Sequence, residues 1–344
     1  MTAHEGYPVK DKVTSLDVAR RAGVSRSAVS RVFTPGASAS EATIAKVQAA
    51  ARDLGYRPNT LARAVVTGKS RIIGLVVAYL DNQFYPLALE KLSLSLQEQG
   101  YHILVFMAQN SPEHVAGIID DLLAYQVDGI ITASVGMTNA LTSRVQDAGI
   151  PVVMFNRGQD DPRLAEVTSD NIAGGRTVAN FLVGGGHARI AHIAGWQGSS
   201  TGVDRMRGFV DGLADHGVTP VTVEDGMYDQ DHASALTRSI FGARTRPDAV
   251  FVGNDHMAFA VLDTLRFELG LRVPHDVSVE GYDDVPIASR QAYDLTTIRQ
   301  PVNRMVEATV TSLLSRIEGD TAPAKVRIPG QLMIRGSARK PDGR

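Results

Sequence analysis

The chain has 344 residues, of which 44% are hydrophobic and none is cysteine, and its formal net charge at pH 7 is −2. This length and hydrophobic content suffice for two or three domains with cores of their own. The absence of cysteine excludes disulfides, thiolate metal sites and cysteine catalysis, and no run of about 18 apolar residues predicts a transmembrane helix. Because residues 1–12 are polar and lack an apolar signal-peptide core, we interpret them as a disordered arm and expect a cytoplasmic protein with no membrane partner.

The charge is distributed unevenly along the chain. Residues 1–70 contain 11 Lys and Arg against five Asp and Glu, a net charge of +6, which leaves −8 for residues 71–344. A basic segment joined to an acidic one is typical of a polyanion-binding module whose other domain is repelled by the same surface. A solvated basic face that binds nothing would have the same composition, so the charge alone leaves both interpretations open.

Residues 13–57 show helical patterns separated by turn signals. The expected caps and ends are Thr14 and Gly23 for a first helix, Ser25 for a second over Arg26–Phe33, and Ser40 and Leu54 for a third. Two short helices separated by a turn that contains glycine are the helix-turn-helix pattern of DNA-binding domains. The sequence therefore predicts an all-α DNA-binding head.

Three pieces of this head closely resemble the LacI/GalR family of bacterial transcription regulators. They are Asp17-Val-Ala-Arg-Arg-Ala-Gly-Val-Ser25, Ala28-Val-Ser-Arg-Val-Phe33 and Leu54-Gly-Tyr-Arg-Pro-Asn59, and the spacing between them also fits. The resemblance implies that Arg26, Ser27 and Ala28 meet base edges in the major groove. Arg31 lies one helical turn further on, and arginine is suited to bidentate contact with guanine.

The resemblance implies a larger set of DNA contacts in the head and the segment after it. The set consists of Thr14, Ser25, Arg26, Ser27, Ala28, Ser30, Arg31, Thr43, Tyr56, Arg57, Asn59, Leu61, Ala62 and Val65. Hydroxyl groups at helix caps can bond phosphates. The alternative for the serines and threonines is that they only cap helices, and the two roles are compatible.

Residues 58–70 are predicted to form a hinge helix and linker. Pro58 can open the helix and Gly68 can end it, with Leu61 and Val65 on one face. In the LacI/GalR family this helix pairs with its twin and inserts a leucine into the minor groove. Val65 occupies that position here, so we expect a shallower wedge, or else packing against the partner hinge. Gly68-Lys69-Ser70 does not form a phosphate loop, because Arg63 replaces the required glycine.

From residue 71 onward, strand-like and helical patterns alternate. The expected strands are Ile72–Ala78, His102–Met107, Gly129–Ala133, Val152–Phe155, Ile190–Ala194, Ala249–Val252 and Val277–Tyr282. The intervening helical windows are Pro86–Gln99, Glu113–Tyr125, Asn139–Ala148, Gly174–Val183, Arg205–His216, Ala233–Phe241 and Met257–Leu269. This alternation predicts two doubly wound α/β lobes with parallel sheets, in which ligands bind at the carboxyl ends of strands.

No set of residues suited to catalysis is found in this part, and no metal or cofactor site is predicted. We interpret His187 and His192 as structural histidines, since they lie near a helix end and within a strand. Gly184-Gly-Gly-His187 lacks the preceding strand of a dinucleotide-binding loop, so a turn explains it better. The sequence does not predict an enzyme.

Residues 71–340 also resemble the effector-binding domain of the LacI/GalR family, which is similar to periplasmic sugar-binding proteins. The matching pieces are Ile73-Gly-Leu-Val-Val77, Gly253-Asn-Asp255, Gly281-Tyr-Asp-Asp284 and Leu295-Thr-Thr-Ile-Arg-Gln-Pro301. The family pattern implies a first lobe over about 71–169 and 301–328. The second lobe is expected over about 170–297 and 329–336. A periplasmic binding protein would need a signal peptide and would have no basic head.

The resemblance places an effector site between the two lobes. Its implied residues are Phe84, Tyr85, Asn156, Arg205, Tyr228, Asp255 and Gln300. Aromatic faces and planar polar groups suit a polyhydroxylated ring. Alternatively, Arg205 and Asp255 form a structural ion pair across the cleft. Asn156 stands where the family often has aspartate, and Trp196 could line the cleft or pack a loop.

Together these features predict a homodimeric transcription regulator of the repressor type, with a near-palindromic double-stranded DNA operator and a carbohydrate effector. The alternative is a corepressor-dependent regulator that senses a nucleobase or another metabolite. The C-terminus lacks heptads, which argues against a coiled coil that would join dimers into tetramers.

Overall fold

The computed structural model describes residues 13–34, 36–58, 68–108, 112–322 and 324–341. The chain divides into two compact units, Met1–Ser70 and Arg71–Arg344. None of the helices in the described ranges is long and apolar enough to cross a membrane.

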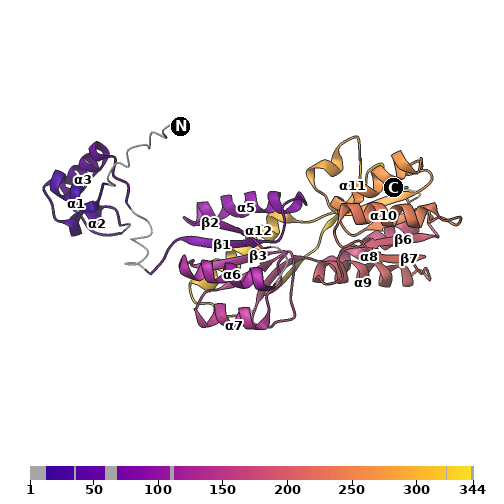
Figure 1. Ribbon diagram of the computed structural model, residues 1–344, viewed down its shortest axis with the longest axis horizontal. Coiled ribbons are helices and arrows are strands. Elements are labelled where there is room, and N and C mark those ends of the chain that lie inside the picture. Colours follow the sequence, from indigo (N-terminus) through magenta and orange to yellow (C-terminus); the bar gives the residue numbers. More distant parts are fainter. Residues whose placement is uncertain (1–12, 35, 59–67, 109–111, 323, 342–344) are drawn as a thin grey trace, which may run out of the picture. The chain divides into compact units, whose positions relative to one another are not determined.

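The first unit contains the predicted helices, α1 (Ser15–Ala22), α2 (Arg26–Val32) and α3 (Glu41–Leu54) (Figure 1). Val18, Val29 and Val47 are almost completely buried and form the centre of its small core. Gly23 and Gly55 end α1 and α3 in the left-handed conformation, which glycine adopts without steric cost.

The second unit consists of two α/β lobes, each built on a sheet of six strands within the described ranges (Figure 1). Lobe 1 has the order β11-β5-β4-β3-β1-β2, and lobe 2 the order β12-β10-β9-β8-β6-β7. The strands of lobe 1 are β1 (Ile72–Val77), β2 (His102–Met107), β3 (Gly129–Ala133), β4 (Val152–Phe155), β5 (Ala165–Ser169) and β11 (Lys325–Ile328). Those of lobe 2 are β6 (Ile190–Ala194), β7 (Thr222–Asp225), β8 (Ala249–Val252), β9 (Ser278–Asp283), β10 (Thr296–Arg299) and β12 (Gln331–Met333).

Strand pairing is parallel except between β10 and β12, so the predicted fold class is confirmed. The sequence pattern missed β5, β7, β10, β11 and β12. Three of these, β7, β11 and β12, lie at sheet edges, where polar residues such as Lys325 and Arg327 interrupt the apolar run. An apolar run is the signal of a strand that is covered on both faces, and these three strands lack it.

Helices cover both faces of each sheet. They are α5 (Phe84–Glu98), α6 (Pro112–Ala124), α7 (Asn139–Asp147) and α12 (Val302–Ile317) in lobe 1, and α8 (Asn171–Gly184), α9 (Ser200–Ala214), α10 (Gln230–Gly242) and α11 (Asp255–Asp263) in lobe 2. The predicted helix Met257–Leu269 is in fact α11 followed by a π-helical turn, Thr264–Glu268. The wider turn keeps the chain helical while Glu268 reaches Arg238 of α10.

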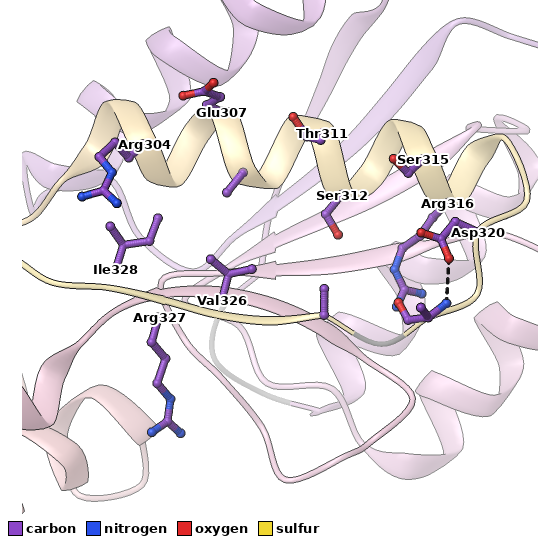
Figure 2. Close-up of a pocket in the computed structure, with 13 residues that line it drawn as sticks. Arg304, Glu307, Thr311, Ser312, Ser315, Arg316, Asp320, Val326, Arg327 and Ile328 are labelled. Atoms are coloured by element: carbon purple, nitrogen blue, oxygen red, sulfur yellow. Dashed lines mark hydrogen bonds between the residues drawn. The ribbon is translucent and has the colours of Figure 1, made fainter.

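A groove of about 560 Å³ lies on lobe 1 between α12 and the edge strand β11 (Figure 2). Arg304 and Asp320 lie near its two ends, and the side chain of Arg327 points away from α12. All of its lining belongs to α12, β11 and the loop between them. The groove is therefore a feature of one lobe and does not lie at the ends of the central strands.

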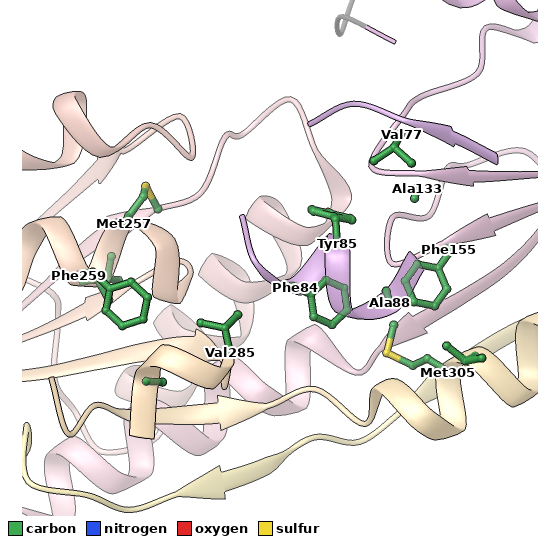
Figure 3. Close-up of a cluster of buried hydrophobic side chains, with 14 of the residues drawn as sticks. Val77, Phe84, Tyr85, Ala88, Ala133, Phe155, Met257, Phe259, Val285 and Met305 are labelled. Carbon is green, nitrogen blue, oxygen red and sulfur yellow. The ribbon is translucent and has the colours of Figure 1, made fainter. Parts of the chain in front are cut away.

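The cores of the two lobes meet around the start of α5. Phe84 packs on Phe155, with ring centroids 6.2 Å apart, and on Tyr85 at 5.5 Å (Figure 3). The same buried cluster continues into lobe 2 through Met257 and Val285. Packing therefore fixes the first turn of α5 without any contribution from a ligand.

Glycines bring α8 and α9 into close contact. A Cβ atom at Gly175 would overlap the carbonyl oxygen of Arg205, and one at Gly208 would overlap the carbonyl oxygen of Ile172. The backbones therefore touch at both crossing points, which a larger residue would prevent. This close approach sets the position of Arg205 on α9.

We expect Gly208→Ala to lower the free energy of unfolding by about 1–3 kcal/mol, because the added methyl group must push α8 and α9 apart. Gly117→Ala on α6 is the matched control, because a Cβ there meets no atom within 4 Å. That change should stabilise the chain by roughly 0.5–1 kcal/mol. Urea denaturation of both variants measures the difference, and equal effects would show that the helices tolerate separation.

Candidate functional site

Helix α2 buries one side and exposes the other. Val29 is 1% exposed and fixes the helix in the core of the head, while Arg26, Ser27, Ser30 and Arg31 are exposed. Ser30 and Arg31 follow Ser27 by three and four residues, so the three side chains share a face of the helix. This face carries hydrogen-bond donors and positive charge, which suits base edges and phosphates.

The hydroxyl groups at the helix starts cap the helices. Thr14 and Asp17 form a reciprocal capping box, Ser25 Oγ accepts from the N–H of Ala28 at 3.2 Å, and Thr43 Oγ1 lies 2.9 Å from Ser40 Oγ. The Thr14 hydroxyl and N–H bonds lower the pKa of the Asp17 carboxyl. Capping by Thr14 and Ser25 leaves their exposed positions compatible with phosphate contact as well.

In lobe 1, polar side chains gather where β1 and β3 end. Strand order reverses between these two strands, and ligands of open α/β sheets bind at such a point. Ser134, directly after β3, donates a hydrogen bond of 3.2 Å to the hydroxyl of Tyr79, which follows β1. The Tyr79 ring meets the Tyr85 ring edge-on at 5.2 Å, and Asn156 Nδ2 donates to the Tyr85 hydroxyl at 3.0 Å.

In lobe 2, the corresponding point lies where β6 and β8 end. Arg205 reaches it from α9 and is only 2% exposed. Its Nη1 donates to the carbonyl of Gly253 at 2.7 Å, its Nε donates to Asn171 Oδ1 at 2.9 Å, and its guanidinium lies 3.8 Å from the Tyr282 ring centroid. Tyr228 lies beside this point as well, with its hydroxyl 3.0 Å from that of Thr201.

Asp283 connects several of these groups. Its carboxylate accepts from Gln300 Nε2 at 2.7 Å and from Asn82 Nδ2 at 3.3 Å, and it forms an ion pair of 3.3 Å with Arg205. Asn82 belongs to lobe 1, so this carboxylate also bridges the lobes. The backbone at Asp283 has a φ of 127°, a strained conformation that the surrounding contacts must maintain.

The alternative ion pair between Arg205 and Asp255 is wrong, because the partner of Arg205 is Asp283. Asp255 is fully buried and accepts instead from Thr297 Oγ1 at 2.6 Å and from the N–H of Val285 at 3.0 Å. Burial, followed by the neighbouring Asp283 carboxylate, raises the pKa of Asp255. Burial likewise raises the pKa of Asp283, although the Arg205 charge opposes this.

Two more contacts join the lobes beside the site. The guanidinium of Arg157 lies 5.3 Å from the Trp196 ring centroid, and the N–H of Gly158 donates to Ser200 Oγ at 2.9 Å. Trp196 therefore faces the opposite lobe and does not only pack its own loop. In addition, Asn156 Oδ1 and Gln300 Oε1 are buried acceptors with no hydrogen-bond partner.

Comparison with known proteins identifies both units. Residues 14–59 match the family described as bacterial regulatory proteins, lacI family, and residues 179–338 match a periplasmic binding protein-like domain. The regulator CelR of Thermobifida fusca is 34% identical over 331 residues, covering 93% of this chain and 96% of CelR. The chain belongs to the LacI family of bacterial regulatory proteins.

Other members of the family agree with this assignment. The sucrose operon repressor of Streptococcus mutans is 32% identical, with 92% of this chain and 97% of that protein covered. The lac repressor dimer bound to operator and the anti-inducer ONPF has a TM-score of 0.87 at 28% identity, covering 95% of this chain and 99% of that one. The CelR–cellobiose complex has a TM-score of 0.72 at 32% identity, covering 95% of this chain and 100% of that one.

This LacI-family chain is thus a DNA-binding repressor with an effector domain, and it is not an enzyme. The structure brings Tyr85 and Asn156 together in lobe 1, and Arg205 and Gln300 together through Asp283. Phe84 lies deeper, in the core. The assignment of effector residues stays a prediction.

For the operator-binding residues, the described part of the head ends at Pro58. Tyr56 packs against Phe33, with ring centroids 5.9 Å apart, and Arg57 is exposed. The predicted contacts Asn59, Leu61, Ala62 and Val65, and with them the hinge helix, lie outside the described residues.

Sequence reasoning missed Asp283, Arg157 and Asn82 as members of the site. The motif Gly281-Tyr-Asp-Asp284 marked Asp283 as a family position but gave it no role. A usable signal existed for Arg157, since it is the second residue after β4, and residues after central strands line this type of site.

The two histidines are structural, as interpreted from the sequence. His192 is completely buried, stacks on Phe251 at 4.6 Å, and its Nδ1–H donates to the Phe251 carbonyl at 2.9 Å. Burial lowers the pKa of His192 to about 4. Burial, together with the charge of Arg339, also lowers the pKa of His187 to about 4.

The buried neutral His192 makes stability fall in acid. Between pH 6.5 and about 4 the unfolded chain binds a proton at this position that the folded chain does not, so the free energy of unfolding decreases as the pH falls through that range. The full effect is roughly 3 kcal/mol. We expect His192→Gln to flatten the profile relative to the parent chain in urea denaturation from pH 8 to 4.5. His187 is present in both proteins, so parallel profiles would contradict the assignment to His192.

Proposed function

We propose that this repressor is a homodimer whose operator binding is controlled by a carbohydrate effector held between the two lobes. The unpartnered acceptors Asn156 Oδ1 and Gln300 Oε1 carry the proposal, because both are buried, Asn156 bonds the Tyr85 hydroxyl, and donors from a ligand would satisfy them. A sugar ring supplies hydroxyl donors in several directions and has faces that pack on aromatic rings. The CelR–cellobiose complex, a structural neighbour, supports this effector class.

The effector would act by changing the closure of the lobes. Three contacts join the lobes in this structure, and an opening of the lobes would break them: Asn82 to Asp283, Arg157 to Trp196 and Gly158 to Ser200. In a dimer, a change in closure alters the distance between the two hinge segments, residues 58–70, and so the balance between ordered and disordered hinges. Operator binding must then change effector affinity by the same factor.

A dimer is supported by large apolar side chains that are exposed on the second unit, Arg71–Arg344. Val105 and Met107 of the edge strand β2 are 41% and 48% exposed, and Leu94 of α5 is 55% exposed. Phe267 in lobe 2 is 81% exposed. Val105 and Met107 share a face of β2, and α5 with Leu94 packs on that strand, so these side chains suit an interface; the lac repressor is dimeric in its operator complex.

The proposal predicts that a carbohydrate releases the chain from its operator. A near-palindromic operator is first selected from random DNA by the protein itself, and its dissociation constant is then measured with cellobiose, sucrose, ribose and their phosphates. We expect one sugar to weaken operator binding at least tenfold and Asn156→Ala to blunt that response. Asn303→Ala, at an exposed position of α12, is the control. A sugar that tightens operator binding would make the chain corepressor-dependent, and release only by nucleobases would refute the carbohydrate class.

The head is tested separately by Arg31→Ala. Loss of a base contact by arginine costs about 1–3 kcal/mol, so specific operator binding should weaken roughly 10- to 100-fold. Arg52→Ala removes the same charge from an exposed position of α3 and should have a much smaller effect. Gel shifts measure operator affinity, and thermal shifts should show unchanged effector binding. Equal operator affinities for the two variants would exclude Arg31 from base readout.

A further inference from the structure

Arg157 and Arg205 are both buried but differ in their partners. Arg205 is 2% exposed, and its charge is compensated by Asp283 while its other donors reach Asn171 and Gly253. Arg157 is 6% exposed and forms no ion pair or hydrogen bond with any described residue. Among the described residues, its contact is the Trp196 ring. A buried cation that contacts an aromatic ring in place of a carboxylate is poorly compensated, because a ring stabilises the charge less than a carboxylate does.

The position of Arg157 is inside the proposed effector site. It directly follows Asn156, whose Oδ1 is one of the unpartnered acceptors. Burial raises the pKa of Tyr79 and Tyr85, and the charge of Arg157 opposes this rise at both groups. Trp196 comes from the opposite lobe.

The geometry also defines which hydrogen-bond donors Arg157 presents to a ligand. A guanidinium stacked on an aromatic ring uses one of its faces, while its N–H groups lie in the plane and point sideways. The buried Nε–H has no acceptor. An in-plane set of free N–H donors matches the two oxygens of a carboxylate or phosphate.

The carboxylates of the site do not pair with Arg157. Asp283 is already paired with Arg205, and Asp284 is paired with Arg299 and Arg335, each at 2.6 Å. Asp255 receives its two hydrogen bonds from Thr297 and Val285. None of these carboxylates forms an ion pair with Arg157 in the part of the chain that the structure describes.

We propose that the effector is an anionic carbohydrate, a hydroxylated ring that carries a phosphate or carboxylate group, and that Arg157 binds this group while Trp196 covers the guanidinium. This inference rests on the proposed effector site and narrows its ligand class. Asn156 and Gln300 would accept from ring hydroxyls, so one ligand satisfies the unmet donor and both unmet acceptors.

Inorganic phosphate tests the anion contact without knowledge of the sugar. The melting temperature of the full chain is followed against phosphate concentration at constant ionic strength, with chloride as the reference salt. We expect saturable stabilisation of the parent chain and at least a tenfold weaker apparent affinity in Arg157→Gln, with Arg157→Lys in between. Arg207→Gln is the matched control, because it removes an exposed arginine from α9. Melting without phosphate confirms that each variant folds, and an equal phosphate response of Arg157→Gln and the parent would overturn the proposal.

The second arm compares glucose, glucose 6-phosphate and glucuronate, and likewise ribose and ribose 5-phosphate, by calorimetry. We expect an anionic sugar to bind at least tenfold more tightly than its neutral parent, and Arg157→Gln to remove that preference. The phosphate and the carboxylate ligands distinguish the two possible anionic groups. If a neutral sugar binds and releases the operator regardless of Arg157, the sensor function stands and this inference fails. Phosphate binding at Arg157 without any sugar response would retain the anion contact of Arg157 but refute both the carbohydrate sensor and the anionic carbohydrate as its ligand.

Discussion

The second unit of this regulator, Arg71–Arg344, depends on the interactions of the Asp283 carboxylate. It compensates the buried charge of Arg205, receives the amide of Gln300 where the chain passes from β10 to α12, and accepts from Asn82 of the opposite lobe. Removing one partner of such a buried group costs more than the bond itself contributes, because the remaining charge is left without solvent. Lobe 2, the crossover and the first loop of lobe 1 are therefore coupled through one side chain.

The fold brings these groups together by two means. Parallel strands place their carboxyl ends at the same edge of each sheet, so Tyr79, Ser134 and Gly253 end up near the boundary of the lobes. Close glycine contacts between α8 and α9 then set the height of Arg205 above the lobe 2 sheet. Tyr282 packs against this arginine from the same strand that carries Asp283, so one strand, β9, both stacks on the cation and neutralises it.

Local patterns predicted the caps Thr14 and Ser25 and the central strands, because these depend on neighbours in sequence. The edge strands β7, β11 and β12 were missed, since polar residues replace the apolar run where one face meets solvent. The pairing of Arg205 with Asp283 and not with Asp255 was not predictable, because it depends on how residues 78 positions apart meet after folding. The isolation of Arg157 was hidden for the same reason, as a missing partner is visible only when every neighbour is placed.

The contacts between the lobes are suited to a switch because each is modest. The hydrogen bond from Gly158 to Ser200 makes a net contribution of about 1 kcal/mol. The stacking of Arg157 on Trp196 contributes about 1 to 2 kcal/mol. Each lobe also has a buried cluster of its own, so part of its interior can stay packed while these contacts change. A ligand can shift such an equilibrium only by its difference in affinity for the two forms, at about 1.4 kcal/mol per tenfold. A ligand that bonds to Arg157 or Asn156 in only one form of the protein has a different affinity for the two forms. Buried polar groups without partners at the boundary of the lobes therefore favour a sensor function over a rigid scaffold.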